Sequence, residues 1–353
     1  MSAVLLTGHG GFGKLEFRTD VATPMPGEGE VLMRILAAGV NNTDVNTRVG
    51  WYSKSVSEAT DSGTSVGFDE VDDDGSWSGE PLGFPRIQGA DCCGRIVAVG
   101  AGVGASRVGE RVLVRTMQER LGSPQRFHTI TFGSEIDGAF AEFAVARATE
   151  TYAIDSGWSD IELASIPCAY STAENLLHRV DLGAERVVIT GASGGVGSAA
   201  VQLAKRRGAE IVAVCGASKS AAVAELGADR VVDRDCDLVA ELGHDSIDVV
   251  VDLVAGAAWS SLLEVLTRGG RYATAGAIAG PLVELDVRTL YLKDLSLIGC
   301  TYQDPIVFEN LIRYIENEEI GPVVAGTYPL TDIVRAQEVF LEKGFVGKLV
   351  LVP

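Results

Sequence analysis

The chain has 353 residues, of which 46% are apolar, with 42 glycines and 11 prolines. This length exceeds one ordinary hydrophobic core, so we expect two well-packed domains with little disorder. The formal net charge of −19 argues against nucleic acids and anionic membranes as partners, because both bind basic surfaces.

The N-terminus has no basic segment followed by a long apolar one, and no run of about 18 apolar residues occurs, so we expect a soluble, cytoplasmic protein.

The first 150 residues are predicted to form a β domain. Short alternating segments at 30–40, 94–100, 110–115 and 139–147 are separated by glycine and proline. They predict an antiparallel, barrel-like β domain.

Residues 53–84 interrupt this pattern with a polar, acidic insert. The segment has no lysine or arginine between Lys54 and Arg86 and neither helical nor strand periodicity. One interpretation is a solvated, partly disordered loop. The other is a lid or partner-contacting loop, because structureless loops of this length in compact proteins are often functional.

Strands and helices alternate over about 120 residues from residue 186. Apolar strands are predicted at 186–190, 210–215, 230–233, 247–255, 271–277 and 295–300, with amphipathic helices between them. This order predicts a parallel sheet covered on both faces, a doubly wound α/β domain. The last 27 or so residues contain a helix and a strand that could pair back with the N-terminal domain.

A glycine-rich turn joins the first of these strands to its helix. Glycines let a backbone approach a pyrophosphate, and the helix N-terminus supplies free N–H groups and the positive end of the dipole. The motif is ASGGVG, with alanine in place of its first glycine. In this strand–turn–helix setting it predicts a dinucleotide site formed by Ala192, Ser193, Gly194, Gly195 and Val196.

The end of the second strand indicates which dinucleotide binds. An NAD site places a carboxylate there, about 20 residues after the glycine motif. This chain instead has Cys215 followed by Gly216, Ser218 and Lys219, which offer space, a hydroxyl and a cation for a 2′-phosphate. We therefore expect NADP(H), although Lys219 could also be a solvated residue that opens a helix.

The six cysteines show no CxxC spacing, and several lie in apolar runs. We expect reduced, buried thiols rather than disulfides or a structural metal. The adjacent Cys92 and Cys93 lie on a predicted strand, which sends neighbouring side chains to opposite faces, so they cannot easily share a ligand.

Taken together, the motifs resemble the medium-chain dehydrogenase/reductase superfamily, in particular its zinc-independent quinone oxidoreductase-like branch. The resemblance spans nearly the whole chain, through residues 26–52, 89–103, 108–114, 137–145, 167–177, 192–197 and 346–352. It implies a GroES-like antiparallel β-barrel catalytic domain and a Rossmann cofactor domain with a doubly wound parallel sheet. We expect the catalytic domain at 1–150 and 303–353, the cofactor domain at 151–302, and a homodimer.

The resemblance also implies that a metal is missing. Zinc-dependent members carry a cysteine, a histidine and a further cysteine where this sequence has Asn41, Ala90 and Cys168. An amide, a methyl group and one thiol cannot supply the three ligands that a catalytic zinc needs. Asp91 could ligate, but it matches an acid of the outer shell. The four-cysteine structural zinc lobe is absent as well, because no cysteine lies between Cys93 and Cys168.

In the branch that the chain resembles, one set of residues lines the substrate cleft. It falls here on Asn41, Asp44, Arg48 and Tyr52, with Tyr170 expected to face the nicotinamide. Thr172, Gly276 and Lys348 are expected near the cofactor. Alternatively, Asn41 and Asp44 could mainly shape the turn after a strand, and Arg48 could simply pair with Asp44.

The resulting expectation is a zinc-independent, NADPH-dependent reductase of quinones or α,β-unsaturated carbonyls. Without a metal, hydrogen-bond donors such as Asn41 and Tyr52 must stabilise the developing negative charge, which suits acceptors that are already activated. The alternatives are a metal-free oxidoreductase of alcohols, aldehydes or enoyl thioesters, and a non-catalytic NADPH-binding protein. The acidic insert begins directly after Tyr52 and could gate the cleft or disfavour anionic substrates.

Overall fold

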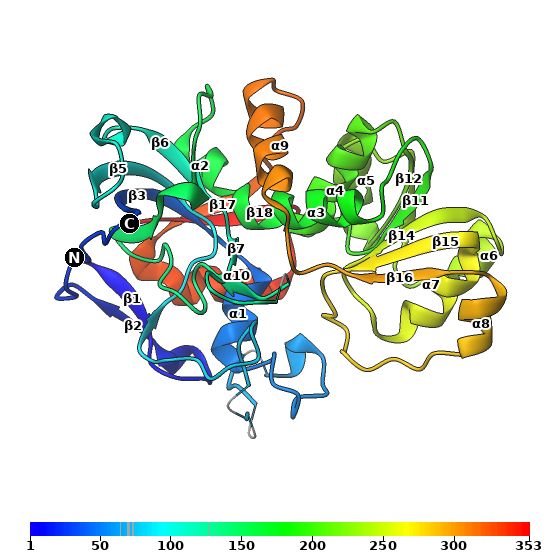
Figure 1. The fold of residues 1–353 in the computed structure, drawn as a ribbon. Helices are drawn as coiled ribbons and strands as arrows, with labels where there is room; N and C mark the ends of the chain where they lie inside the picture. Colours follow the sequence, from blue (N-terminus) through cyan, green and yellow to red (C-terminus); the bar gives the residue numbers. More distant parts are fainter. Residues whose placement is uncertain (64, 69–70, 73, 126) are drawn as a thin grey trace.

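The computed structural model describes residues 1–63, 65–68, 71–72, 74–125 and 127–353. The acidic insert predicted at 53–84 therefore includes four positions, 64, 69, 70 and 73, that lie outside the described residues. Two lobes lie side by side in Figure 1, with β18 and α3 between them. Among the described residues, no helix is long and apolar enough to cross a membrane.

The catalytic domain is built around one long strand, β3 (Glu30–Val40). It pairs antiparallel with β5, β9 and β18, so three separate parts of the chain meet on it. The seven-stranded sheet comprises β10 (Thr151–Ala153), β6 (Arg111–Val114), β5 (Cys93–Val99), β3, β18 (Lys348–Val352) and β17 (Val324–Pro329), with β9 (Phe143–Arg147) beside β3. The sheet is antiparallel, as the sequence predicts, except where β17 pairs parallel with β18.

Two smaller sheets complete the catalytic domain. They are β2 (Leu15–Arg18), β1 (Ala3–Leu6) and β4 (Arg86–Ile87), and the pair β7 (Met117–Glu119) and β8 (Thr129–Thr131). Three helices pack on this domain: α1 (Asn42–Val49), α2 (Asp160–Ala164) and α10 (Ile333–Glu342). An apolar core of β-strand residues such as Met33, Ile96 and Leu351 fills its interior.

The cofactor domain contains a six-stranded, wholly parallel sheet, as the sequence predicts. The spatial order is β13 (Arg230–Asp233), β12 (Glu210–Cys215), β11 (Arg186–Ile189), β14 (Ile247–Asp252), β15 (Leu266–Thr274) and β16 (Ser296–Gly299). The strands are added outward in one direction from β11 to β13 and in the other from β14 to β16, so the strand order reverses between β11 and β14. Nucleotides bind at such a switch point in Rossmann folds.

Seven helices cover this sheet or join it to the catalytic domain. They are α3 (Pro167–Arg179), α4 (Gly195–Arg206), α5 (Ser220–Glu225), α6 (Leu238–Leu242), α7 (Trp259–Val265), α8 (Val287–Leu292) and α9 (Pro305–Glu316). One apolar core runs from Ala37 and Cys93 in the catalytic sheet through α3 to Val187 in β11. This shared core fixes how the two domains meet.

The domain boundaries differ slightly from those expected. β10, at Thr151–Ala153, pairs antiparallel with β6 and therefore completes the catalytic sheet rather than starting the cofactor domain. At the other end, β18 pairs with β3, which confirms that the C-terminal strand returns to the N-terminal domain. The cofactor domain is thus inserted between two parts of the catalytic domain.

The described part of the acidic insert packs against the molecule. It contains a 3-10 turn at Thr60–Gly63 and buried residues that include Ser53, Val56 and Ser76. A Cβ added to Gly67 would lie 2.6 Å from the Cα atom of Gly10, so the insert touches the N-terminal loop closely. A solvated loop does not describe these contacts.

Candidate functional site

The turn between β11 and α4 has the geometry of a phosphate-binding loop. Gly191 adopts a φ of +60°, which only glycine reaches without strain, and so makes the turn that the sequence analysis sought at Ala192. A Cβ on Gly197 would lie 2.2 Å from the carbonyl oxygen of Gly191, so this glycine permits the close approach of helix and strand. The first-turn N–H groups of α4, from Gly195 and Val196, have no partner within the helix and could therefore bind an anion.

Two positively charged side chains, Lys219 and Arg234, lie near the end of β12. Arg234, which follows β13, has its Nε atom 3.9 Å from a Cβ built on Gly216. Lys219 is half-buried there, and burial together with the nearby Arg234 lowers its pKa. The exposed Ser218 adds a hydroxyl, and β12 itself ends in Cys215 rather than in a carboxylate. The sequence analysis missed Arg234, because it lies one strand further along.

The C-terminal segment of the catalytic domain touches this cofactor loop. The Gly347 N–H donates to the Ser193 carbonyl at 3.1 Å, and Lys219 Nζ donates to the Lys343 carbonyl at 2.9 Å. A Cβ on Gly195 would lie 2.7 Å from Cδ of Lys348, so the Lys348 stem packs on the start of α4. Lys348 therefore lies next to the glycine-rich loop that is expected to bind the cofactor.

The head of Lys348 lies in a buried polar network. Its Nζ atom is 2.8 Å from Asp91 Oδ2 and donates to the Val40 carbonyl at 2.9 Å and to Asn41 Oδ1. Asn41 Nδ2 donates to the same Asp91 oxygen at 2.8 Å and to the Gly39 carbonyl at 3.3 Å. The Asp91 and Lys348 side chains are 0% and 3% exposed, so water screens this ion pair very little.

This network occupies the region where zinc-dependent members of the superfamily carry their ligands. Asp91 Oδ1 also accepts the Cys168 N–H at 2.5 Å, so both carboxylate oxygens are engaged. Of the three positions that hold zinc ligands in those members, only Cys168 has a suitable donor here, because Asn41 and Ala90 offer an amide and a methyl group. No cluster of three or more metal-binding side chains occurs among the described residues. These residues do not fit a zinc ion.

Asp44 caps helix α1. Its carboxylate accepts the Asn41 N–H at 2.7 Å and the Gly89 N–H at 3.3 Å, and the side chain is fully buried. Burial raises the pKa of Asp44 to about 7, while the hydrogen bond from Asn41 opposes that shift. Asp44 therefore shapes the turn after β3, which is the alternative that the sequence left open.

Arg48 points away from the substrate cleft. Its Nε atom donates to Gln337 Oε1 at 2.9 Å, its Nη1 atom donates to the Gly10 carbonyl at 2.9 Å, and its guanidinium lies over the Phe12 ring. The side chain is fully buried. Both expectations for Arg48, a cleft contact and a pair with Asp44, are thereby corrected, because the last turn of α1 faces α10 and the N-terminal loop.

Tyr170 also lies in the core. Its hydroxyl donates to the Gly321 carbonyl at 2.5 Å and accepts from Gln202 Nε2 at 3.0 Å, between α3 and α4. This placement corrects the expectation that Tyr170 faces the nicotinamide. Thr172, two residues along α3, is half-buried and donates its hydroxyl to the Cys168 carbonyl at 2.8 Å.

A cleft of about 630 Å³ opens between the two domains. Tyr52 and Trp51 line it from the catalytic side, and Gly276 lies in the opposite wall, at the carboxyl end of β15. Burial raises the pKa of the Tyr52 phenol well above its ordinary value, and the neighbouring Thr43 and Asn46 side chains partly offset this effect. Tyr52 is thus a neutral phenol whose hydroxyl lies beside Thr43 and Asn46.

The acidic insert reaches the same cleft. Trp77 and Lys54 belong to its lining, and the Thr60 N–H donates to the Ile278 carbonyl of the cofactor domain at 3.2 Å. Sequence reasoning missed Trp77, because no periodicity in the insert indicates which residues face inward. The insert begins at the cleft, as expected, and bridges the two domains.

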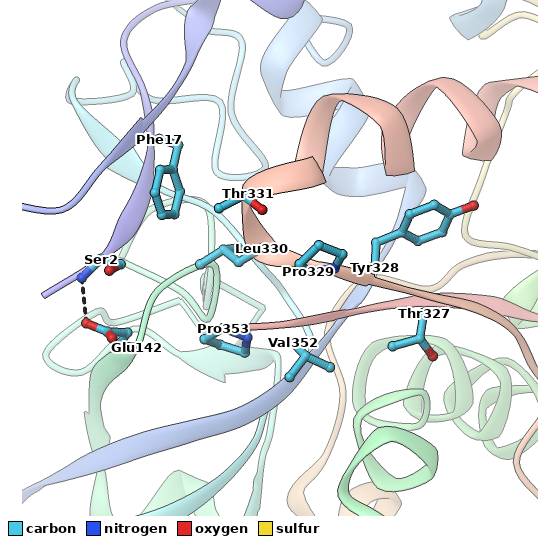
Figure 2. Close-up of a pocket in the computed structure, with 10 residues that line it drawn as sticks. All are labelled: Ser2, Phe17, Glu142, Thr327, Tyr328, Pro329, Leu330, Thr331, Val352 and Pro353. Carbon is cyan, nitrogen blue, oxygen red and sulfur yellow. Dashed lines mark hydrogen bonds between the residues drawn. The ribbon is translucent and has the colours of Figure 1, made fainter.

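A separate hollow lies at the far end of the catalytic domain, beside both chain termini. Figure 2 shows Ser2, Phe17, Leu330 and Val352 around it, with the Glu142 carboxylate hydrogen-bonded to the Ser2 N–H at 2.6 Å. One Glu142 carboxylate oxygen is thus engaged by the backbone, and the other residues that line the hollow are apolar or carry hydroxyl groups. We attribute no chemistry to this hollow.

Comparison with known proteins places these features in context. Residues 27–156 match the family model described as alcohol dehydrogenase GroES-like domain, and residues 195–317 match the one described as zinc-binding dehydrogenase. The chain is 29% identical to acryloyl-coenzyme A reductase of Metallosphaera sedula, with 99% of each chain covered. It is 28% identical to human quinone oxidoreductase, with 99% of this chain and 97% of that one covered.

A solved structure is more similar in sequence. The crystal structure of a protein named as a putative alcohol dehydrogenase from Sinorhizobium meliloti is 46% identical, with a TM-score of 0.89, over 100% of this chain and 96% of that one. The similarity therefore extends over both domains and the insert.

The buried network predicts a large loss of stability when its cation is removed. Lys348→Met keeps the stem that packs on Gly195 but leaves the Asp91 carboxylate without its positive partner. We expect the free energy of unfolding, measured by urea denaturation, to fall by about 3–5 kcal/mol. The double variant Asp91→Asn/Lys348→Met should recover most of this loss, and a single variant as stable as the wild type would contradict the account.

Proposed function

Because the chain belongs to the medium-chain dehydrogenase/reductase superfamily, we propose that this oxidoreductase is an NADPH-dependent, zinc-independent reductase of quinones or α,β-unsaturated carbonyls. The observation that carries the proposal is the Lys348–Asp91–Asn41 network, because it places a buried ammonium group where a metal would need thiolate or imidazole ligands. The acceptor must then be one that needs no Lewis acid.

The cofactor preference rests on charge at the end of β12. Ser218, Lys219 and Arg234 provide a hydroxyl and two cations, and β12 ends without a carboxylate that would repel a 2′-phosphate. The turn at Gly191 and the first turn of α4 would hold the pyrophosphate. When bound, the reduced nicotinamide supplies the hydride. The protein's part is to orient the cofactor and the acceptor.

Tyr52 is the best-placed donor for the acceptor oxygen. Its ring lines the cleft, and its raised pKa keeps the phenol protonated across the neutral range. A neutral phenol can donate a hydrogen bond to an oxygen on which negative charge develops as hydride arrives. Asn41, by contrast, directs its N–H groups to Asp91 and Gly39, so it serves as a positioning residue that holds the network together.

Solvent can complete the reaction. An activated alkene that accepts hydride at one carbon leaves an enolate, which needs one proton, and a quinone anion needs the same. Water at the mouth of the cleft can provide that proton, since the chemistry requires no strong acid once charge is delocalised over a carbonyl. The cleft therefore needs orientation and one hydrogen-bond donor rather than a dedicated proton relay.

Reduction of an enoyl thioester is the second candidate. Lys54 and Arg179 line the cleft, and both carry positive charge that would suit an anionic substrate such as a coenzyme A ester. The similarity to an acryloyl-coenzyme A reductase favours the same class. This candidate retains the metal-free hydride chemistry and changes only the acceptor.

The expected homodimer and cytoplasmic location stay predictions. β16 forms one edge of the parallel sheet, and exposed apolar side chains lie in the loop and helix that precede it, at Leu282, Val287, Tyr291 and Leu292. An open edge with an apolar neighbourhood is compatible with pairing to a second copy.

The cofactor proposal predicts that charge reversal at Lys219 weakens NADPH binding selectively. Because a charge-assisted hydrogen bond is worth roughly 1.5–3 kcal/mol, Lys219→Glu should raise the dissociation constant for NADPH about ten- to a hundredfold. The constant for NADH should change far less. Fluorescence titration with both cofactors checks this, with the exposed Arg18→Glu as a control for the same change in net charge. An unchanged NADPH-to-NADH preference would overturn the assignment.

The function itself is tested with a panel of acceptors. We expect NADPH oxidation with quinones and open-chain enones, and no oxidation with saturated ketones. Tyr52→Phe should lower kcat for these acceptors roughly tenfold or more by removing one oxyanion donor, with little effect on NADPH binding. Failure of every quinone, enone and enoyl thioester as an acceptor would contradict the proposal.

A further inference from the structure

Trp77 lies in the acidic insert, yet its ring stands beside the expected catalytic tyrosine. The ring centroids of Trp77 and Tyr52 are 4.8 Å apart at an interplanar angle of 43°. The Trp77 indole N–H donates to the Thr43 hydroxyl at 2.5 Å, which ties the insert to the first turn of α1. The indole is half-buried, so part of it remains available to the cleft.

The cleft has several further aromatic walls. Trp51 packs edge-on against Tyr52 at 5.7 Å, and Phe127 packs edge-on against Tyr302 at 5.4 Å. All four line the cleft together with Trp77. The Tyr302 hydroxyl is fixed by Glu119 Oε1 at 2.8 Å, so that ring is held in place.

The wall on the cofactor-domain side is formed mainly by small residues, with Arg179 of α3 beside them. It consists of the ends of β15 and β16 and the residues that follow them, Thr274–Ala277 and Gly299–Thr301. Short side chains at a strand end leave a low surface on which a flat cofactor ring can lie. A ring-shaped acceptor between this wall and the aromatic rings would contact flat surfaces on both sides.

The described insert residues at the cleft carry no negative charge. Among the described insert residues, those that line the cleft are Lys54 and Trp77, neither of which is acidic. Asp74 instead accepts from the Ser53 hydroxyl at 2.6 Å and from the Lys54 N–H at 3.1 Å. The expectation that the insert disfavours anionic substrates stays a prediction, because three of its acidic positions, 69, 70 and 73, lie outside the described residues.

We propose that Trp77 is a specificity-determining residue that selects planar cyclic acceptors, quinones and cyclic enones, over open-chain ones. The inference rests on the proposed function and narrows its substrate class. A rigid ring gains stacking contact with Trp77 and Tyr52 beyond what its buried area supplies, and it loses no internal rotations on binding. An open-chain enal or an acyl thioester gains neither advantage.

The test compares one cyclic with one open-chain acceptor, 1,4-naphthoquinone and trans-2-hexenal, in steady-state NADPH oxidation. Trp77→Leu keeps apolar bulk and removes the aromatic face, whereas Trp77→Phe keeps a ring and loses the hydrogen bond to Thr43. We expect Leu to raise KM for the quinone about two- to tenfold, with a much smaller change for the enal. Phe should restore most of the quinone KM.

Other results would overturn the inference. If Trp77 only anchors the insert through Thr43, both variants will lose activity toward both acceptors equally. If Leu supports the quinone as well as tryptophan does, apolar volume rather than stacking sets the preference. A wild type that reduces the enal and acyl thioesters but not the quinone would refute the role of Trp77 and leave the reductase function standing, whereas no turnover with any acceptor would refute the proposed function itself.

Discussion

The buried ion pair between Lys348 and Asp91 is the interaction on which the arrangement of this protein depends. Lys348 begins β18, and Asp91 lies just before β5, which begins at Cys93. The pair therefore joins sequence positions more than 250 residues apart. Removing either partner would leave a buried charge uncompensated, which is strongly destabilising. The C-terminal strand, Asn41 and the start of α3 must therefore all be in place together.

The same pair links the two domains. Its ammonium group lies in the catalytic domain, while the Lys348 stem rests on the first residue of α4 in the cofactor domain. The Gly347 N–H bond to Ser193 holds the adjacent backbone to the same loop. A cofactor bound at this loop would thus lie against a segment whose position the ion pair fixes. The same contacts therefore position the cofactor loop relative to the catalytic domain.

Much of the fold could be predicted from hydrophobic periodicity and from the positions of glycine and proline, because strands and turns depend largely on local sequence. The parallel sheet and the return of the C-terminal strand follow this rule. The departure from a zinc-ligand set could be recognised in the sequence as well, since Asn41 and Ala90 carry neither the sulfur, imidazole nor carboxylate donors that zinc uses. The turn glycine was placed one residue late, because Gly191 rather than the ASGGVG motif itself carries the positive φ.

Side-chain direction could not be predicted in the same way. Tyr170 and Arg48 fall in segments that resemble cleft-lining motifs, but each lies on a helix face whose partners come from distant parts of the chain, Gly321 and Gln337. Trp77 shows the reverse case, because its insert has no periodic pattern and only tertiary contacts bring the indole to Tyr52. Orientation is set by packing that local sequence does not encode.

The most direct test of the metal-free account is the zinc content of the purified protein after incubation with zinc and extensive dialysis, measured together with NADPH oxidation before and after treatment with a chelator. The Lys348–Asp91–Asn41 network predicts far less than one zinc ion per chain and activity that the chelator leaves unchanged. One tightly bound zinc per chain, with activity lost on its removal and restored on its return, would contradict the account.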